Sequence, residues 1–532
     1  MGRVTKLRSG ASQRTEVNDE LVEFLRNSAA YGDGLGPVEC VETHISWVFI
    51  TDEFAYKLKK PVRFDFLDFS TSELRRKACE DEVRLNRRLA RHVYLGVLPV
   101  THRHGQLSLN GEGTPVDWVV KMRRLPADRS LDRLIQSSGI ETQGAQQIAL
   151  LLSQFFAHLP PLTIRPDDYR RRLDDHVRHN RDQLLANKND VNQGVIRRIH
   201  EAQILLLHLV PETFGNRALD GRIVEGHGDL RPEHIYLAPA PTIIDCIEFS
   251  AELRQLDVLD ELCFLAMECE RLNAGWIGDE VIAQYRSVSG DQWPERLAAF
   301  YKCYRACVRA KVSTLRADQT TGQNKARAEQ LANDYLRLAD KLREELGRPV
   351  LLIVRGLSGT GKTTLAQELS EVLEIERLET DAIRRELFGV SQSPAEYGMA
   401  IYQPESRARV YEEMLRRAKI LIDSGCSAIL DGTFLTTKSR TDALVLAAAG
   451  RAVPLVIQCH CPNDVARQRI AARLAAGRSR SESRPDIHAG QKEDEEPDPP
   501  DINVCRVDAT ASLPAMVKLV LKRLGADWIS AN

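Results

Sequence analysis

Two short stretches of this sequence carry residues whose types and spacing suit phosphate chemistry. The less ambiguous one is GLSGTGKT, from Gly356 to Thr363, which fits the pattern G-x-x-x-x-G-K-[S/T]. Glycines let consecutive backbone N–H groups turn toward an anion, Lys362 can reach the outer phosphates, and Thr363 can hold Mg²⁺. The stretch therefore predicts an ATP-binding P-loop. The residues expected to bind nucleotide are Gly356, Leu357, Ser358, Gly359, Thr360, Gly361, Lys362, Thr363 and Thr364.

Polar residues that follow the P-loop suit the transfer step. In TDAIRREL, Asp381 comes just after a short strand and Arg384 lies one helical turn further on. Asp381 could accept the proton of an attacking hydroxyl, while Arg384 holds an anionic part of the acceptor. The alternative is an Asp that caps a helix, followed by a surface Arg. Asp431 ends the strand SAILD and is expected on the Mg²⁺ side of the loop.

An arginine-rich segment, ARQRIAARLAAGRSRSESR, comes later in the chain. Arg469 and Arg473 are one turn apart on a helix, and Arg478 and Arg480 follow in a loop. These side chains could form a mobile lid that neutralises charge during transfer. A solvated helix face is the other interpretation, and it needs no function.

The second stretch is HGDLRPEHIYL, residues 227–237. Asp229 is placed to orient or deprotonate an acceptor hydroxyl, and Asp245 ends a short strand where it could take Mg²⁺. Lys57 on an earlier strand could bind the α- and β-phosphates, held there by Glu82 of the following helix. Five residues after Asp229, where a kinase loop carries a metal-binding Asn, this chain has His234.

Three interpretations of His234 stay open, because Mg²⁺ prefers hard oxygen ligands and imidazole replaces them poorly. His234 could hydrogen-bond Asp229 or a metal-bound water, which leaves metal binding to Asp245. The site could take a softer metal such as Mn²⁺, with His234 as a ligand. Or the region could bind nucleotide or substrate without turnover.

GLSGTGKTT, TDAIRREL, ILDGTF and the arginine-rich segment together resemble the small P-loop kinases, over roughly residues 348–525. That group includes polynucleotide kinase 5′ domains, zeta-toxin-like kinases and chloramphenicol phosphotransferases. The resemblance implies ATP-dependent phosphorylation of a hydroxyl with Asp381 as the base. The chain departs from the group after Arg480, where QKEDEEPDPPD is acidic and Pro-rich, and we expect a solvated loop there.

The first half resembles the aminoglycoside phosphotransferase-like family, whose loop reads H-G-D-x-x-x-x-N. The whole chain is similar to bacterial proteins that fuse such a domain to a P-loop, AAA-type kinase domain. THISWVFITDEFAYKLKKPV, LDFST, LNRRLA, HGDLRPEHI, DCIEF and YRACVRAKV carry that resemblance. It implies nucleotide-site roles for Lys57, Asp229 and Asp245. The turn TDE lacks the glycines of a loop that closes over ATP.

These motifs need particular elements to position them. Two strands at 40–62, the first at 40–50 and joined to the second by the turn TDE, are followed by a charged helix, a second strand pair and long helical stretches at 141–215 and 251–345. This order predicts a protein-kinase-like domain. We place it at residues 1–345, with a small lobe at about 20–125 and a helical lobe at about 126–345. After GRP the pattern alternates strand and helix, which predicts a doubly wound parallel sheet at 346–532. The fold class is therefore α/β joined to α+β.

Composition limits the function classes. A net charge of −2 and a 28% charged composition give no global attraction to nucleic acid, and no basic groove interleaved with aromatics is evident. No apolar run reaches the ~18–20 residues of a membrane span. The odd number of cysteines, 11, argues against a disulfide framework and favours a reducing cytoplasm.

We therefore expect an ATP- and Mg²⁺-dependent phosphotransferase that acts on a small-molecule hydroxyl. The P-loop half is expected to be catalytic, and the first half a second phosphotransferase altered at His234. The alternative is a nucleotide-gated regulatory protein whose first half senses a small molecule without chemistry. Asp257, Asp260 and Glu261 could bind a cationic acceptor, but acids on a helix surface are the commoner explanation.

Overall fold

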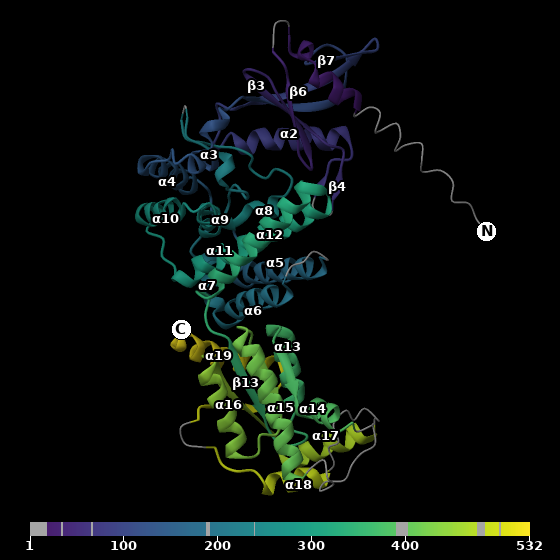
Figure 1. Ribbon diagram of the computed structural model, residues 1–532, viewed down its shortest axis with the longest axis vertical. Helices are drawn as coiled ribbons and strands as arrows, with labels where there is room; N and C mark the ends of the chain where they lie inside the picture. The colour runs from purple at the N-terminus through teal and green to yellow at the C-terminus, as the bar shows by residue number, and fades with distance from the viewer. Residues whose placement is uncertain are drawn as a thin grey trace, which may run out of the picture. The chain divides into compact units, whose positions relative to one another are not determined.

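The computed structural model describes residues 19–32, 36–64, 67–187, 192–238, 240–389, 403–475, 485–498 and 502–532. The chain divides into two compact units (Figure 1). Unit 1 contains residues 1–164 and 220–292, and unit 2 contains residues 165–219 and 293–532. Across the described ranges, no helix combines the length and the apolar character needed to cross a membrane.

An antiparallel sheet of six strands forms the first part of unit 1, in the order β1-β2-β3-β8-β6-β7. Its strands are β1 (Glu39–Glu42), β2 (Ser46–Ile50), β3 (Phe54–Lys59), β6 (Tyr94–Arg103), β7 (Gln106–Leu109) and β8 (Thr114–Arg123). Helix α2 (Ser72–Asn86) begins after Thr71, whose side chain accepts from the N–H of Leu74. Helix α2 packs on β6 and β8, and β8 pairs with β3, the strand that carries Lys57. Glu82 of α2 therefore lies within reach of Lys57.

The strand expected at 40–50 is in fact two strands, and that prediction was wrong in this detail. A turn closes at Thr43, whose N–H donates to the carbonyl of Ser46 at 2.8 Å. The Thr43 hydroxyl also donates to the Ser46 carbonyl, at 3.0 Å, and accepts from the Ser46 N–H. A polar side chain that bonds to nearby backbone groups ends a strand in this way.

Short elements and helices complete unit 1. They are η1 (Ser28–Tyr31), β4 (Arg63–Phe64), β5 (Leu67–Asp68), η2 (Ala127–Arg129), α3 (Leu131–Gln136), α4 (Thr142–Ala157), β9 (Ile223–Glu225), η3 (Pro232–His234), β10 (Ile235–Tyr236), β11 (Thr242–Ile243), α8 (Ala251–Arg254), β12 (Gln255–Asp257), α9 (Val258–Arg271) and α10 (Gly275–Ser289). The HGD loop lies between β9 and η3, and Asp245 lies two residues after the end of β11. This order of elements confirms the predicted protein-kinase-like fold class.

A parallel sheet of five strands forms the centre of the P-loop region, in the order β14-β15-β13-β16-β17. Its strands are β13 (Val350–Arg355), β14 (Glu376–Glu379), β15 (Ala428–Asp431), β16 (Val453–His460) and β17 (Val504–Asp508). The helices between them are α13 (Lys362–Leu373), α14 (Thr380–Phe388), α15 (Pro404–Asp423), α16 (Thr437–Ala449), α17 (Asn463–Ala475), α18 (Pro485–Glu493) and α19 (Leu513–Ala531) (Figure 1). The doubly wound parallel sheet predicted from the sequence is confirmed.

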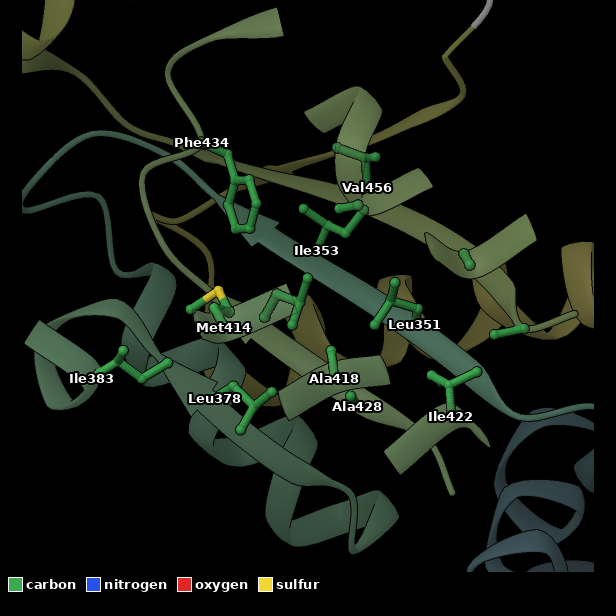
Figure 2. Close-up of a cluster of buried hydrophobic side chains, with 14 of the residues drawn as sticks. Leu351, Ile353, Leu378, Ile383, Met414, Ala418, Ile422, Ala428, Phe434 and Val456 are labelled. Atoms are coloured by element: carbon green, nitrogen blue, oxygen red, sulfur yellow. The ribbon is translucent and has the colours of Figure 1, made fainter. Parts of the chain in front are cut away.

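The core of this region lies against the central strand (Figure 2). Every residue of β13 is buried, and Leu351 and Ile353 contribute to one apolar cluster with Met414 and Phe434. A strand that is apolar on both faces belongs in the middle of a parallel sheet, with helices on each side. The sheet is thus a rigid base, and its strand ends position the polar residues that follow them.

Unit 2 also contains five long helices that we assigned from the sequence to the first domain. They are α5 (Pro166–Ala186), α6 (Gln193–Leu209), α7 (Pro211–Leu219), α11 (Glu295–Asp318) and α12 (Gly322–Arg343). Arg178 of α5 donates to the carbonyl of Val372 at 2.8 Å and pairs with Glu374, at the end of the P-loop helix α13. The boundary near 345 stays a prediction, because packing does not mark where a domain ends along the chain.

Glu201 of α6 makes the most deeply buried of these contacts. Its Oε1 accepts from the N–H of Ser427 at 2.5 Å, just before β15. Burial raises the pKa of the Glu201 carboxyl to about 7, against the opposing effect of the Ser427 hydrogen bond. A folded state that binds a proton more tightly than the unfolded chain loses stability as the pH rises between the two pKa values.

We therefore expect Glu201→Gln to match the wild type near pH 4.5 and to be more stable at pH 8. The Gln side-chain oxygen can still accept from the Ser427 N–H, but it cannot ionise. Removing the cost of ionising the buried acid should raise the unfolding free energy at pH 8 by about 3 kcal/mol at most. Urea unfolding at the two pH values measures the difference. Glu344→Gln, whose side chain is 74% exposed, is the matched control and should show no such pH dependence. An equal effect of both substitutions at pH 8 would contradict the assignment.

Candidate functional sites

The first site, called the HGD site here, contains Lys57, Glu82, Asp229, His234 and Asp245. Its Lys57 Nζ lies 2.9 Å from Glu82 Oε1 and 2.7 Å from Asp245 Oδ1. Burial would lower the pKa of this lysine, but the charges of Asp245 and Glu82 raise it well above its usual value. Lys57 is therefore charged, and the structure brings together three residues that lie far apart in the sequence.

A second buried lysine supports this ion pair, and the sequence analysis missed it. The Lys59 Nζ lies 2.6 Å from Glu82 Oε2 and also pairs with Glu248. The side chains of Lys59 and Glu82 are both fully buried. A signal did exist in FAYKLKK, because alternate residues of a strand share one face and so Lys59 must accompany Lys57.

The HGD loop is held by a carboxylate from α9. Glu261 accepts from the N–H of His227 at 2.8 Å and from the N–H of Gly228 at 2.5 Å. We had considered Glu261, with Asp257 and Asp260, as a helix-surface acid or a ligand for a cationic acceptor. All three are buried, so the surface interpretation was wrong. Glu261 instead fixes the backbone that presents Asp229.

His227 is a structural member of the same loop. Its Nε2 lies 2.9 Å from the carbonyl oxygen of Ile244, which can only accept, so Nε2 carries a proton. Burial, together with the nearby His234, lowers the pKa of His227 to about 4. The ring is therefore neutral at physiological pH, and it ties the loop to the residue before Asp245.

The tautomer of His234 follows from its two neighbours. Its Nδ1 lies 2.9 Å from the backbone oxygen of Asp229, so Nδ1 donates. Its Nε2 lies 3.1 Å from Nη2 of Arg231, which can only donate, so the Nε2 lone pair accepts. The proposed metal role of His234 stays a prediction. In this arrangement it would require the bond from Arg231 to break.

Asp245 is the most constrained residue of the HGD site. Its φ of 65° lies in the left-handed region, where a non-glycine residue is strained unless its surroundings hold it. Its N–H donates to the Tyr94 hydroxyl at 3.1 Å. Burial would raise the pKa of its carboxyl, but the charge of Lys57 holds that pKa well below its usual value.

The HGD site thus has its carboxylates already balanced by cations of the protein. Asp229 Oδ2 lies 2.9 Å from Arg231, and Asp245 pairs with Lys57 and lies 3.6 Å from His234 Nε2. In the described part of the chain, no group of three or more His, Cys, Asp or Glu side chains is arranged to hold a metal ion. A divalent cation at Asp245 would need these pairs to rearrange.

The P-loop site is built at the carboxyl ends of β13, β14 and β15. Gly359 and Gly361 have φ of 83° and 87°, which let the loop curl before α13 begins at Lys362. A Cβ at Gly356 would lie 2.5 Å from the carbonyl oxygen of Cys459, so no other residue fits there. The backbone therefore has the tight curl that a phosphate group requires.

Asp431 meets the P-loop as its position at a strand end predicts. Its Oδ1 lies 3.4 Å from the Thr363 hydroxyl, and its Oδ2 lies 2.7 Å from Arg377. Burial raises the pKa of Asp431, against the charges of Lys362 and Arg377. A hydroxyl and a carboxylate side by side offer the hard oxygen donors that Mg²⁺ prefers, so these residues fit that ion.

Asp381 and Arg384 lie in the first turns of α14. Arg384 Nη1 donates to Asp381 Oδ1 at 2.6 Å. The residue before this helix is Glu379, so Asp381 does not take the capping position that we considered as its alternative role. The pair places the Asp381 carboxylate and the Arg384 guanidinium side by side, just after the end of β14.

The arginine-rich segment is described only in part. Arg469 donates to the backbone oxygen of Ala509 at 2.8 Å, and its guanidinium lies beside Gly361 of the P-loop. The side chain of Arg473, and all of Arg478 and Arg480, lie outside the described residues. The lid stays a prediction.

The sequence predicts a solvated loop for the acidic stretch after α18, and residues 494, 496 and 497 are indeed exposed, but two other carboxylates of the stretch are half-buried. Residues 494–498, called the acidic strap here, contain two carboxylates that reach Arg355, the last residue of β13. Arg355 is 2% exposed and lies 3.0 Å from Glu495 and 2.5 Å from Asp498. Buried guanidinium groups need such partners, which the sequence alone does not reveal.

Comparisons with known proteins agree with the C-terminal motif. Residues 351–497 match the family model of an AAA domain, which confirms the predicted P-loop domain. The chain is 36% identical over 465 residues to the uncharacterized proteins Rv2004c of Mycobacterium tuberculosis and Mb2027c of Mycobacterium bovis. The alignment covers 83% of this chain and 87% of each relative.

Solved structures that resemble the chain include two described as kinases. A choline/ethanolamine kinase family protein from Mesorhizobium loti is 14% identical, with 61% of this chain and 99% of that chain covered and a TM-score of 0.35. A gluconokinase from Sinorhizobium meliloti is 17% identical, with 34% of this chain and 94% of that chain covered and a TM-score of 0.26.

The HGD site gives a stability prediction. Lys59→Met would leave Glu248 and one oxygen of Glu82 buried without their cation, which costs about 3–5 kcal/mol of unfolding free energy. Urea unfolding followed by the fluorescence of Trp47 and Trp118, which lie in the same sheet, measures this loss.

Lys60→Met is the matched control. Its partner Glu42 is 60% exposed, and such a surface pair contributes about 1 kcal/mol or less. The double variant Lys59→Met/Glu248→Met should recover part of the loss, because no unpaired carboxylate remains at position 248. Equal losses for Lys59→Met and Lys60→Met would show that Lys59 does not support the site.

Proposed function

The chain belongs to the family of the mycobacterial proteins Rv2004c and Mb2027c, and we propose that it is a cytoplasmic ATP-dependent phosphotransferase. We assign catalysis to the P-loop site, with the hydroxyl of a small molecule as acceptor. The observation that carries this proposal is the grouping of Lys362, Thr363, Asp431 and Asp381 at the carboxyl ends of adjacent parallel strands. Ligands of open α/β sheets bind at this edge.

Each residue of the P-loop site has a role that its position supports. The backbone N–H groups of the curled loop and the start of α13 would bind the phosphates of ATP. Lys362 would neutralise their charge, and Thr363 with Asp431 would hold Mg²⁺. When bound, the nucleotide supplies the γ-phosphoryl group and the metal neutralises charge that develops during transfer.

Asp381 would act as the base. It would take the proton of the acceptor hydroxyl as the new P–O bond forms and the bond to ADP breaks. Its ion pair with Arg384 at 2.6 Å holds the carboxylate in place between turnovers. Arg384 would then hold the acceptor or the transferred group, because a guanidinium can bind two oxygens at once.

For the HGD site we propose a second, altered phosphotransferase. Lys57, held by Glu82, would bind the α- and β-phosphates, and Asp229 would orient the acceptor hydroxyl. Asp245 would be the remaining carboxylate for a metal. Among the three interpretations of His234, its bond to the backbone of Asp229 favours a role within the loop over a role as a metal ligand.

A regulatory role is the second candidate for this half. One observation favours it, namely that Arg231 and Lys57 already neutralise Asp229 and Asp245. A site whose carboxylates are balanced by the protein can bind an anion at Lys57 without needing a metal. In that case the first half would sense a nucleotide or small molecule, and the P-loop half alone would transfer phosphate.

Calorimetric titration of a non-hydrolysable ATP analogue with Mg²⁺ tests both statements. We expect wild type to bind two equivalents, Lys362→Ala to lose one, and Lys57→Ala to lose the other, because each lysine provides the main cation for phosphate at its site. Lys438→Ala, whose side chain is 83% exposed, is the control and should bind as wild type.

Three outcomes separate the hypotheses. One equivalent that Lys362→Ala abolishes would remove the HGD site as an ATP site. If wild type binds two equivalents of the analogue and the HGD site fills equally well in EDTA, the regulatory role is favoured. Either tight binding with no labelled phosphate transferred to any small-molecule hydroxyl, or transfer that Asp381→Asn leaves undiminished, would contradict the proposed catalysis.

A further inference from the structure

Helix α18 contacts the P-loop through both backbone groups of one residue. The Ser358 N–H donates to Gln491 Oε1 at 2.9 Å, and the Ser358 carbonyl lies 2.7 Å from His488 Nδ1. A carbonyl only accepts, so Nδ1 of His488 carries a proton. His488 and Gln491 are three residues apart and therefore share one face of the helix.

These contacts are shielded from water. Ser358 is 5% exposed and His488 is 3% exposed. The next residue of the loop, Gly359, lies so close to α17 that a Cβ there would be 2.7 Å from the carbonyl oxygen of Ala466. The first part of the P-loop is therefore enclosed by α17 and α18. A buried N–H or carbonyl that loses its partner carries the full cost of desolvation.

The acidic strap fixes α18 to the sheet from the other end. Glu495 and Asp498 pair with the buried Arg355, one residue before the P-loop begins. Arg440 of α16 donates to the backbone oxygens of Glu496 at 2.9 Å and Pro497 at 2.7 Å. Arg440 is fully buried and also donates to the backbone oxygens of Phe434 and Leu435, so the strap supplies the ion pairs of Arg355 and part of the hydrogen bonding of Arg440.

We propose that His488 and Gln491 are positioning residues for the P-loop, and that the acidic strap keeps α18 seated on it. This inference rests on the proposed nucleotide-binding function of the P-loop site. Neither side chain needs to touch the nucleotide. Together they fix both peptide groups of Ser358, so that the N–H groups of the following residues point inward before a ligand arrives.

Preorganisation is the physical reason for an effect on binding. A loop that must order when it binds ATP pays conformational entropy, whereas a loop already held in shape does not. Loss of one bond to Ser358 should therefore weaken nucleotide binding without removing any group that contacts the phosphates. We therefore expect the loss to raise KM and Kd for ATP more than it lowers kcat.

Single substitutions in α18 test the positioning role. We expect Gln491→Ala and His488→Ala each to raise the Kd for the ATP analogue about tenfold, which corresponds to about 1.4 kcal/mol. We expect Gln491→Glu, which keeps an acceptor oxygen, and His488→Asn, whose amide can donate in place of Nδ1, to recover most of the affinity. Lys492→Ala, an exposed change on the same helix, is the matched control.

The readouts separate positioning from simple loss of fold. Calorimetry gives Kd, steady-state turnover of ATP gives KM and kcat, and thermal unfolding checks that each variant is folded. Unchanged Kd in folded Gln491→Ala and His488→Ala would overturn the inference while leaving the proposed function intact. If wild type itself bound no nucleotide at Lys362, the proposed function would fail first, and the inference with it.

A second pair of variants tests the strap. Glu495→Gln/Asp498→Asn removes both carboxylates from Arg355, and we expect faster tryptic cleavage after Lys492 together with a raised Kd. Glu493→Gln, an exposed acid on α18, is the control. Faster cleavage without any change of Kd would show that the strap does not act on the P-loop, and unchanged cleavage would show that its ion pairs do not hold α18.

Discussion

The carboxylate of Glu82 is shared by two buried lysines, and the arrangement of the HGD site depends on it. One oxygen lies 2.9 Å from Lys57 and the other 2.6 Å from Lys59. Burial would raise the pKa of this carboxyl, but the two ammonium groups lower it, so it is ionised in the folded protein. Loss of the Glu82 carboxylate would leave Lys57 with Asp245 alone and Lys59 with Glu248 alone, and buried charges with too few partners are costly.

This constraint also orders the segment that follows β11. Asp245 binds the other side of Lys57, and Glu248, three residues later, binds Lys59. Two lysines on one strand face therefore hold both ends of DCIE, while the Tyr94 hydroxyl and His227 hold its start. The left-handed backbone at Asp245 persists because so many bonds determine it. A strained backbone conformation persists only where the surrounding contacts hold it in place.

Much of this could be predicted from the sequence, and what could not has a common physical cause. The P-loop, the strand-end acids Asp381 and Asp431, and the pair of Lys57 with Glu82 were recognisable because local spacing and element order define them. Lys59 with Glu248, Glu261 on the HGD loop, and Arg355 with the strap are partners across 33 to 189 residues. A charged residue in a sequence is expected on the surface, so its burial can be recognised only when the position of its partner is known.

The two sites differ in the groups that contact their carboxylates. At the P-loop site Asp431 also pairs with a cation, because its Oδ2 lies 2.7 Å from Arg377, but its Oδ1 faces the Thr363 hydroxyl at 3.4 Å. At the HGD site Arg231 and Lys57 neutralise Asp229 and Asp245, and His234 lies between the two acids with its lone pair turned to Arg231. An Asn at position 234 would offer an oxygen to a metal, whereas the second ring nitrogen of His234 lies 3.1 Å from Arg231 Nη2. A role of His234 as a metal ligand would have to break this contact, so the two residues act together at this position.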